Sequence, residues 1–320
     1  MRRTGLLVVV LVCAGLWPAP PSPAVPPPGA PNCPVFPRNN VWHADVSKLP
    51  VNKRSAAWLA SMHAGTSFLH PDFGPSGGAM PYGIPYTTVS GSHRKVHVAF
   101  QYAGESDPGP YPLGPHTPIE GGQNASGDRH AIMVDRDHCR LYELFDARYS
   151  AKGSTAGSGA IWSLGSNRLR PVGWTSADAA GLPIFPGLVR LDEVEKRRVV
   201  DHAIRFTAQR TDRRFIWPAR HQAGAADDRN LPPLGARFRL KASFPTGKYR
   251  PDTQVILRAM KKYGLILADN GSNWYFQGTA ETGWPVKMLD QLKRIPASAF
   301  VAVDESSLRV SRDSGRARAT

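Results

Sequence analysis

Acidic side chains and a histidine that could exchange protons are concentrated in one short stretch of the chain. They are Asp128, His130, Glu143 and Asp146. A histidine hydrogen-bonded to a carboxylate can act as a base, and a pair of carboxyl groups can act as acid and base toward a glycosidic bond. This stretch is therefore the first candidate for a catalytic site.

The residues around this stretch predict an antiparallel hairpin. Two runs rich in apolar residues flank a short polar loop, and the pattern places Val134 opposite Cys139. In that register His130 faces Glu143, and Asp128 lies on the same face, because facing residues of an antiparallel pair point to the same side. The hairpin would gather an imidazole and two carboxylates at one end of an apolar face.

Glu143 is the leading acid/base candidate in this arrangement, with His130 tuning it. Its partner would be Asp128 or Asp146, although Asp146 has the opposite parity and joins the site only if the strand bends there. Glycoside hydrolysis needs two carboxyl groups about 5 Å or about 6.5–9.5 Å apart. The alternative is a buried ion pair that fixes the register of the hairpin, and the sequence leaves both interpretations open.

A turn near the C-terminal end supplies candidate substrate-binding residues. Asp269 and Asn270 precede a glycine, and Trp274 follows shortly after. The indole could stack on a sugar ring while the two polar side chains hold its hydroxyls, and His221 is counted with them. Because Asn-Gly is a strong turn signal, a plain turn is the alternative.

Two histidines are the candidates for a metal site. His202 and His221, with Asp201 nearby, could supply imidazole and carboxylate ligands. No local spacing signature such as H-E-x-x-H accompanies them. We therefore expect no cofactor, and name these histidines as the ligands if a metal is bound.

The first residues have the layout of a secretory signal peptide. Arg2 and Arg3 form a charged start, an apolar run covers 6–12, and small residues stand at 22–24. The apolar run is shorter than the roughly 20 residues that span a membrane. We expect a secreted, extracellular protein with no membrane span, and disfavour a lipid anchor.

The cysteines fit an oxidising compartment. Of three, Cys13 falls within the predicted signal peptide, which leaves Cys33 and Cys139. Two cysteines in an exported protein favour a disulfide, with two unrelated thiols as the alternative. The bridge would tie the start of the mature chain to the second strand of the hairpin.

The chain is strongly basic. Its 40 Lys and Arg against 25 Asp and Glu give a formal net charge of +15. The basic residues are spread out, with short clusters only at 196–198 and 213–214, so a nucleic-acid partner is not expected. In an exported protein the charge favours a polysaccharide or other anionic envelope polymer as the partner, or serves solubility. We expect a monomer.

The predicted fold class is α+β, with a mainly antiparallel, β-sandwich-like core and flanking helices, because neighbouring strands look like hairpins. A second hairpin would pair 202–208 with 213–217, and a third would join 265–268 to 274–277. The expected helices are at 55–63, 192–199, 251–263 and 284–292. The expected organisation is a signal peptide at 1–24, a Pro-rich tether at 25–38, a single globular domain at 39–304 and a disordered basic tail at 305–320.

Eight motifs distributed along the chain carry a resemblance to known sequences. They are CPVFP (33–37), GDRH (127–130), LYE (141–143), GSGAI (157–161), GWTSADAAGLP (173–183), PGLVR (186–190), WPARH (217–221) and ADNGS (268–272). With these motifs the chain resembles a family of secreted bacterial proteins without an assigned activity. The resemblance implies export and a single architecture, and supplies neither a reaction nor catalytic residues.

Three functional hypotheses follow. The first is a secreted carbohydrate-active enzyme, a glycoside hydrolase or lyase acting on an extracellular or cell-wall polysaccharide. The second is a non-catalytic envelope or carbohydrate-binding protein, and the third is a metal-dependent hydrolase using the histidines. If Glu143 is sealed in the core and hydrogen-bonded on all sides, the enzyme hypothesis fails.

Overall fold

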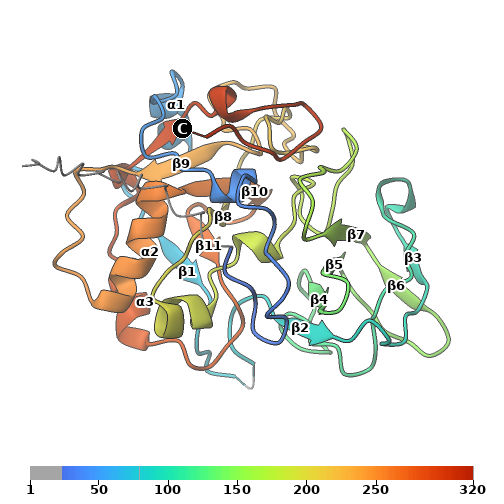
Figure 1. Ribbon diagram of the computed structural model, residues 1–320. Coiled ribbons are helices and arrows are strands. Elements are labelled where there is room, and N and C mark those ends of the chain that lie inside the picture. Colours follow the sequence, from blue (N-terminus) through green and yellow to red (C-terminus); the bar gives the residue numbers. More distant parts are fainter. Residues whose placement is uncertain (1–23, 79, 320) are drawn as a thin grey trace, which may run out of the picture.

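The computed structural model describes residues 24–78 and 80–319, which form three β-sheets and several helices (Figure 1). Almost all of the predicted signal peptide lies outside the described residues. Within the described ranges, no helix is long and apolar enough to cross a membrane.

The largest sheet has six strands and is mixed in direction. At its centre, β8 (Ile204–Ala208) is buried along its whole length and lies between a parallel and an antiparallel neighbour. The strand order is β1 (His70–Asp72), β11 (Tyr275–Gln277), β8, β10 (Leu265–Asn270), β9 (Arg237–Leu240) and β12 (Phe300–Val303).

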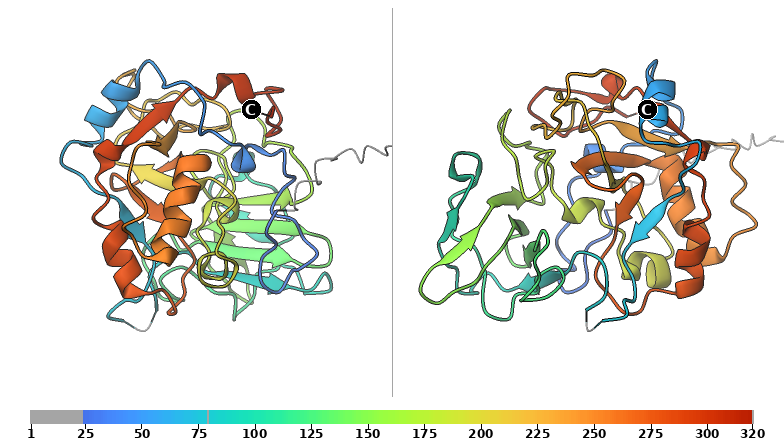
Figure 2. Two further views of the ribbon diagram at one scale, coloured as in Figure 1. Left: turned by 60° about the vertical axis from the view of Figure 1, so that its left-hand side comes forward. Right: turned by 180° about the vertical axis from the view of Figure 1, so that it is seen from behind.

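Helices cover the side of this sheet that faces away from the second sheet (Figure 2). The helix α2 (Pro251–Lys262) begins with a proline, whose missing N–H costs nothing in the first turn, and is followed by Gly264 at φ +72°. The others are α1 (Ser55–Ser61), α3 (Val286–Leu292) and a π-helical turn, η4 (Asp192–Arg197). Short 3-10 turns are η1 (Val41–His43), η2 (Ala103–Glu105), η3 (Phe185–Gly187), η5 (Ala297–Ala299) and η6 (Ser306–Leu308).

The second sheet contains the hairpin that the sequence predicts around 128–146. Its order is β2 (Tyr86–Val89), β4 (Ala131–Asp135), β5 (Arg140–Phe145) and β7 (Ser158–Ser163). A two-stranded sheet of β3 (Val98–Phe100) and β6 (Ser154–Ala156) lies beside it.

The α+β class is confirmed, and the sheets are mixed, with parallel pairs nearly as common as antiparallel ones among the described strands. Parallel pairing joins β1 to β11, β8 to β10, β2 to β4, and β3 to β6. The expected hairpins at 202–217 and 265–277 are wrong, because β10 and β11 both pair with β8 and 213–217 pairs with other loops. Strands do form within 202–208, 265–268 and 274–277, but long-range packing selected their partners.

The first hairpin forms, in a register two residues from the predicted one. Asp135 pairs with Arg140, and Glu143 faces Ile132. The turn covers 136–139 instead of the predicted 135–138, because the Asp135 carboxylate accepts hydrogen bonds from the backbone N–H groups of Asp137 and His138. Cys139 adopts φ +50° within this turn. A shift of two preserves side-chain parity, so Glu143 stays on the face predicted for it.

Both segments that were expected to be free of the core are packed against it. In 25–38, Cys33 and Val35 are buried and the Val25 N–H donates to Asp201. In the described part of the predicted tail, Leu308 is buried and Asp313 pairs with Arg220 at 2.6 Å. Apolar residues among the prolines and charges give these segments surface to bury.

The predicted disulfide is confirmed. Cys33 and Cys139 are joined across 106 residues of sequence, which fixes the N-terminal segment to the turn between β4 and β5. A long closed loop restricts the unfolded chain more than the folded one, which stabilises the fold.

Replacing both cysteines by alanine is expected to lower the free energy of unfolding by about 2–4 kcal/mol. Urea denaturation of the oxidised protein and of the double variant measures the change. Wild type treated with a reductant serves as the control and should match the variant. An unchanged midpoint in both samples would contradict a stabilising role for the bridge.

Candidate functional site

A loop at 174–182, within the GWTSADAAGLP motif, connects the two large sheets. On one side the Ser158 hydroxyl at the start of β7 donates to the Ser176 carbonyl. On the other side the Ala180 N–H donates to the Ala268 carbonyl in β10 at 2.9 Å. The loop therefore sits where strand ends of both sheets meet.

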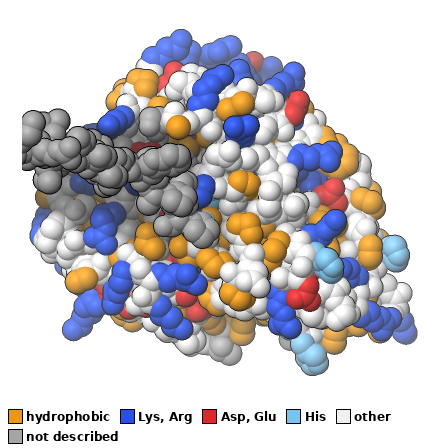
Figure 3. Space-filling model, viewed as in Figure 1, with side chains coloured by type: hydrophobic (Ala, Val, Ile, Leu, Met, Phe, Trp, Pro, Cys, Tyr) orange, Lys and Arg blue, Asp and Glu red, His pale blue; other side chains and the backbone are white. Residues whose placement is uncertain are grey.

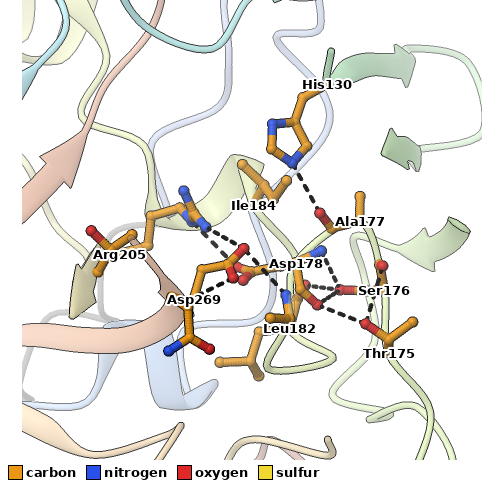
Figure 4. Close-up of polar contacts among 12 residues, drawn as sticks. His130, Thr175, Ser176, Ala177, Asp178, Leu182, Ile184, Arg205 and Asp269 are labelled. Carbon is orange, nitrogen blue, oxygen red and sulfur yellow. Dashed lines mark hydrogen bonds and ion pairs between the residues drawn. The ribbon is translucent and has the colours of Figure 1, made fainter. Parts of the chain in front are cut away.

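A buried arginine pairs with two aspartates at this junction (Figure 4). Arg205 in β8 places Nε 3.2 Å from Oδ2 of Asp178 in the loop, and Nη2 3.7 Å from Oδ2 of Asp269 in β10. Arg205 and Asp178 are 3% and 0% exposed. Buried charges are tolerated when they are paired, so the two carboxylates make this arginine possible in the core.

Asp269 has an unusual environment for a carboxyl group. Its side chain is 24% exposed, and Oδ2 accepts a hydrogen bond from the Ala179 N–H at 3.4 Å. Desolvation, reinforced by the negative charge of Asp178, outweighs the attraction of Arg205 and raises the pKa of Asp269 to about 7. A carboxyl group with such a pKa can donate a proton at neutral pH.

Asp269 opens into a cavity of about 370 Å³ between the sheets. Its walls combine carboxylates, amides, hydroxyls and aromatic rings, as is common for small-ligand sites. The lining includes Tyr102, Glu105, Asp128, Phe145, Ser158, Thr175, Asp178, Ala179, His221, Gln222, Asp269 and Asn270.

A histidine and a glutamate lie next to each other in the wall of this cavity. His221 Nδ1 lies 2.9 Å from the Ala179 carbonyl, so that Nε2 points to Oε2 of Glu105 at 3.7 Å. The Thr175 N–H donates to the same Glu105 carboxylate at 3.0 Å. The cavity thus holds a positioned carboxylate besides Asp269.

His130 lies directly behind the cavity wall. Its Nδ1 is 2.6 Å from Oε2 of Glu120. Its Nε2 is 3.0 Å from the Ala177 carbonyl, a contact drawn in Figure 4. Burial would lower the pKa of His130, but the charge and hydrogen bond of Glu120 outweigh it and raise the pKa to about 9. At neutral pH His130 is therefore a cation that holds the loop.

Glu143 does not reach the cavity, which corrects its assignment as the leading catalytic group. Its side chain is fully buried and accepts backbone hydrogen bonds from Ile184 and Phe185 at 2.8–3.0 Å. Burial raises the pKa of Glu143 to about 7. The geometry gives it the role of attaching the chain after the loop to β5.

Two other candidates also lie elsewhere. Asp146, at φ +47° just after β5, pairs with Arg148 at 2.8 Å and with Arg129 at 3.7 Å, and does not line the cavity. Trp274 is buried in the core, where its indole N–H donates to the Met62 carbonyl, so it presents no face to a sugar.

The two histidines proposed as metal ligands do not share a site. His202 is buried against Glu193 at 3.2 Å and the Ala203 carbonyl at 2.8 Å, whereas His221 faces the cavity. Among residues 24–78 and 80–319, no group of three or more His, Cys, Asp or Glu side chains is arranged to hold a metal ion.

The structure brings together four of the predicted site residues: Asp128, His221, Asp269 and Asn270. Sequence reasoning missed Arg205 and Asp178. A signal for the arginine existed, since it is the one charged residue in the segment 203–208 and a buried charge requires a partner. Nothing local indicated which carboxylates would supply it.

Comparison with known proteins gives no further guide: no family model matches the chain, and no curated protein and no solved structure matches it significantly.

Replacing Arg205 by methionine is expected to lower the free energy of unfolding by about 3–5 kcal/mol, because Asp178 is left buried without its partner charge. Urea denaturation measures the loss. The matched control is Arg258→Met on the exposed face of α2. Equal effects of the two substitutions would show that the buried ion pair contributes nothing specific.

The His130–Glu120 pair predicts a pH-dependent stability. The pKa of His130 is about 6.5 in the unfolded chain and about 9 in the folded protein. The pair therefore contributes fully to the stability of the fold below about pH 6.5, and this contribution is lost as the pH rises through about 9. The His130→Gln variant should have a lower free energy of unfolding than wild type, and this difference should shrink by up to about 3 kcal/mol as the pH rises across this range. Denaturation at a series of pH values tests it, with exposed His63→Gln as control. A loss that does not change with pH would contradict the charged state of His130.

Proposed function

We propose that the protein is a secreted carbohydrate-active enzyme, a hydrolase or lyase that cleaves an extracellular or cell-wall polysaccharide in the cavity between the sheets. Because Glu143 is sealed in the core, we assign the acid to Asp269 instead. One observation carries the proposal: the partly exposed carboxyl group of Asp269 shares an open cavity with the carboxylates of Glu105 and Asp128. Desolvation raises the pKa of Asp269 to about 7. Groups of this kind supply the acid and the base of glycosidic cleavage.

In the hydrolytic form, Asp269 donates its proton to the oxygen of the leaving sugar as the bond to the anomeric carbon breaks. Glu105, held by Thr175 and His221, accepts a proton from the water whose oxygen joins that carbon. Arg205 lies 3.7 Å from the Asp269 carboxylate and stabilises the charge that Asp269 acquires. The bond is cleaved with one water consumed.

The remaining walls offer the contacts that a sugar needs. Tyr102 is 48% exposed and Phe145 is half-buried, so both present ring surface to the cavity. Asn270 and Gln222 carry amides that can both donate to and accept from hydroxyls. Asp128, exposed at the rim, adds a further acceptor.

A non-catalytic carbohydrate-binding protein is the second candidate. Asp178 pairs with Arg205, and Glu143 accepts backbone hydrogen bonds. Both carboxyl groups therefore have a structural role, which favours a protein that does not use them for catalysis. In this alternative the cavity binds a glycan and no bond is cleaved.

The test is a panel of extracellular and cell-wall polysaccharides, with wild type compared with Asp269→Asn. Loss of the general acid is expected to reduce kcat by about 10²–10⁴-fold. Wild-type kcat should fall as the pH rises above about 7, because Asp269 loses its proton. Exposed Asp290→Asn on α3 is the matched control and should retain full activity.

Reducing-end release and product chromatography measure turnover, and circular dichroism verifies folding. Binding of a glycan without turnover anywhere in the panel would favour the second candidate. Turnover that Asp269→Asn leaves intact would remove Asp269 from the mechanism.

A further inference from the structure

A second hollow region has features of a ligand site and, among the described residues, it shares no lining residue with the cavity at Asp269. It runs along β2 and the loops that lead to β3 and β6, as two hollows of about 610 and 250 Å³. Arg94, Val96 and Tyr149 line both hollows, which makes them one continuous groove. We name it the basic groove and define it by His93, Arg94, His97, His116, Arg136 and Lys152.

We propose that the basic groove binds an acidic polysaccharide. Among residues 24–78 and 80–319, no Asp or Glu lines the groove, whereas Glu105, Asp128 and Asp178 line the cavity at Asp269. In Figure 3, the visible His side chains lie toward the lower right, with Lys or Arg side chains and an acidic one among them, over the part of the molecule where β2, β3 and β6 lie in Figure 1.

The cations of the groove are available to a ligand. Within the described part of the chain, the side chains of Arg94 and Lys152 make no ion pair or hydrogen bond, and both residues are exposed. Among the described residues, the guanidinium of Arg136 pairs only with the Asp137 carboxylate, at 3.9 Å, and both side chains are about half exposed. Solvent screens such a surface pair, so Arg136 can also turn to an anion.

The backbone of the groove is held in place before any ligand arrives. Val96 and Tyr111 exchange backbone hydrogen bonds at 2.8 and 2.9 Å, and the Arg136 N–H donates to the Val89 carbonyl at 3.0 Å. The Gly114 N–H donates to the Thr117 hydroxyl at 2.9 Å. A preformed groove loses little conformational freedom on binding.

The chemistry of the lining favours an acidic polysaccharide over other polyanions. The cations are spread along the groove, which suits a polymer with repeated carboxylates, and imidazole N–H groups can donate to hydroxyls. Tyr149 and Val96 give sugar rings an apolar surface, which a polyphosphate would not use. Single-stranded nucleic acid needs a row of aromatic platforms, and Tyr149 is the one aromatic residue that lines the groove in the described chain.

The test uses the full mature chain and polygalacturonate, with pullulan as the neutral polysaccharide. Titration calorimetry should show binding to polygalacturonate that weakens with added salt, and none to pullulan. Arg94→Ala combined with Lys152→Ala should weaken binding by at least about tenfold. The matched control, Lys287→Ala with Arg294→Ala on and after α3, removes the same charge and should change it less than about twofold.

Equal weakening by the two double variants would overturn the proposal, because net charge alone would then explain the binding. Tighter binding of polyphosphate or of single-stranded DNA than of polygalacturonate would overturn the assignment to a polysaccharide. The inference does not depend on chemistry at Asp269, because within the described chain the basic groove shares no lining residue with the cavity at Asp269. Loss of binding in Arg94→Ala with Lys152→Ala therefore tests the groove whether or not any polysaccharide is cleaved.

Discussion

The positive charge of Arg205 pairs with the carboxylates of Asp178 and Asp269 where the two large sheets meet. The loop at 174–182 and the wall of the cavity depend on that pairing. Asp178 comes from the loop that contacts both sheets, and Asp269 comes from the neighbouring strand. A charge in the core is very costly without a partner. The loop at 174–182 is therefore held in one position, and with it the wall of the cavity.

The same pairing gives the two aspartates different properties. Asp178 is sealed beside Arg205, whereas Asp269 keeps part of its surface in the cavity. Because both carboxylates share one cation, their mutual repulsion and the low polarity around them raise the pKa of Asp269. His130 supports the arrangement from the other side, since its cation donates to Glu120 and to the loop carbonyl of Ala177.

Much of the local structure could be predicted from the sequence. Proline and glycine marked the ends of α2, apolar runs around a polar loop identified β4 and β5, and the two cysteines indicated their bridge. The hairpin register was wrong by two residues because the turn is set by hydrogen bonds to the Asp135 side chain. A shift of two residues leaves each side chain on the same side of the hairpin. The face predicted for Glu143 was therefore right, whereas the residue predicted to lie opposite it was wrong.

The sequence by itself determined the residue types available for chemistry, the α+β class, and the faces that strands and helices bury, because these depend on neighbours along the chain. Only the tertiary structure decided that Glu143 and Trp274 are sealed in the core and that Asp269 and His221 share a cavity with Glu105. The reason is physical: burial and the pairing of charges are set by residues far apart in sequence, such as Arg205 and Asp178, and no local pattern records which of them will meet.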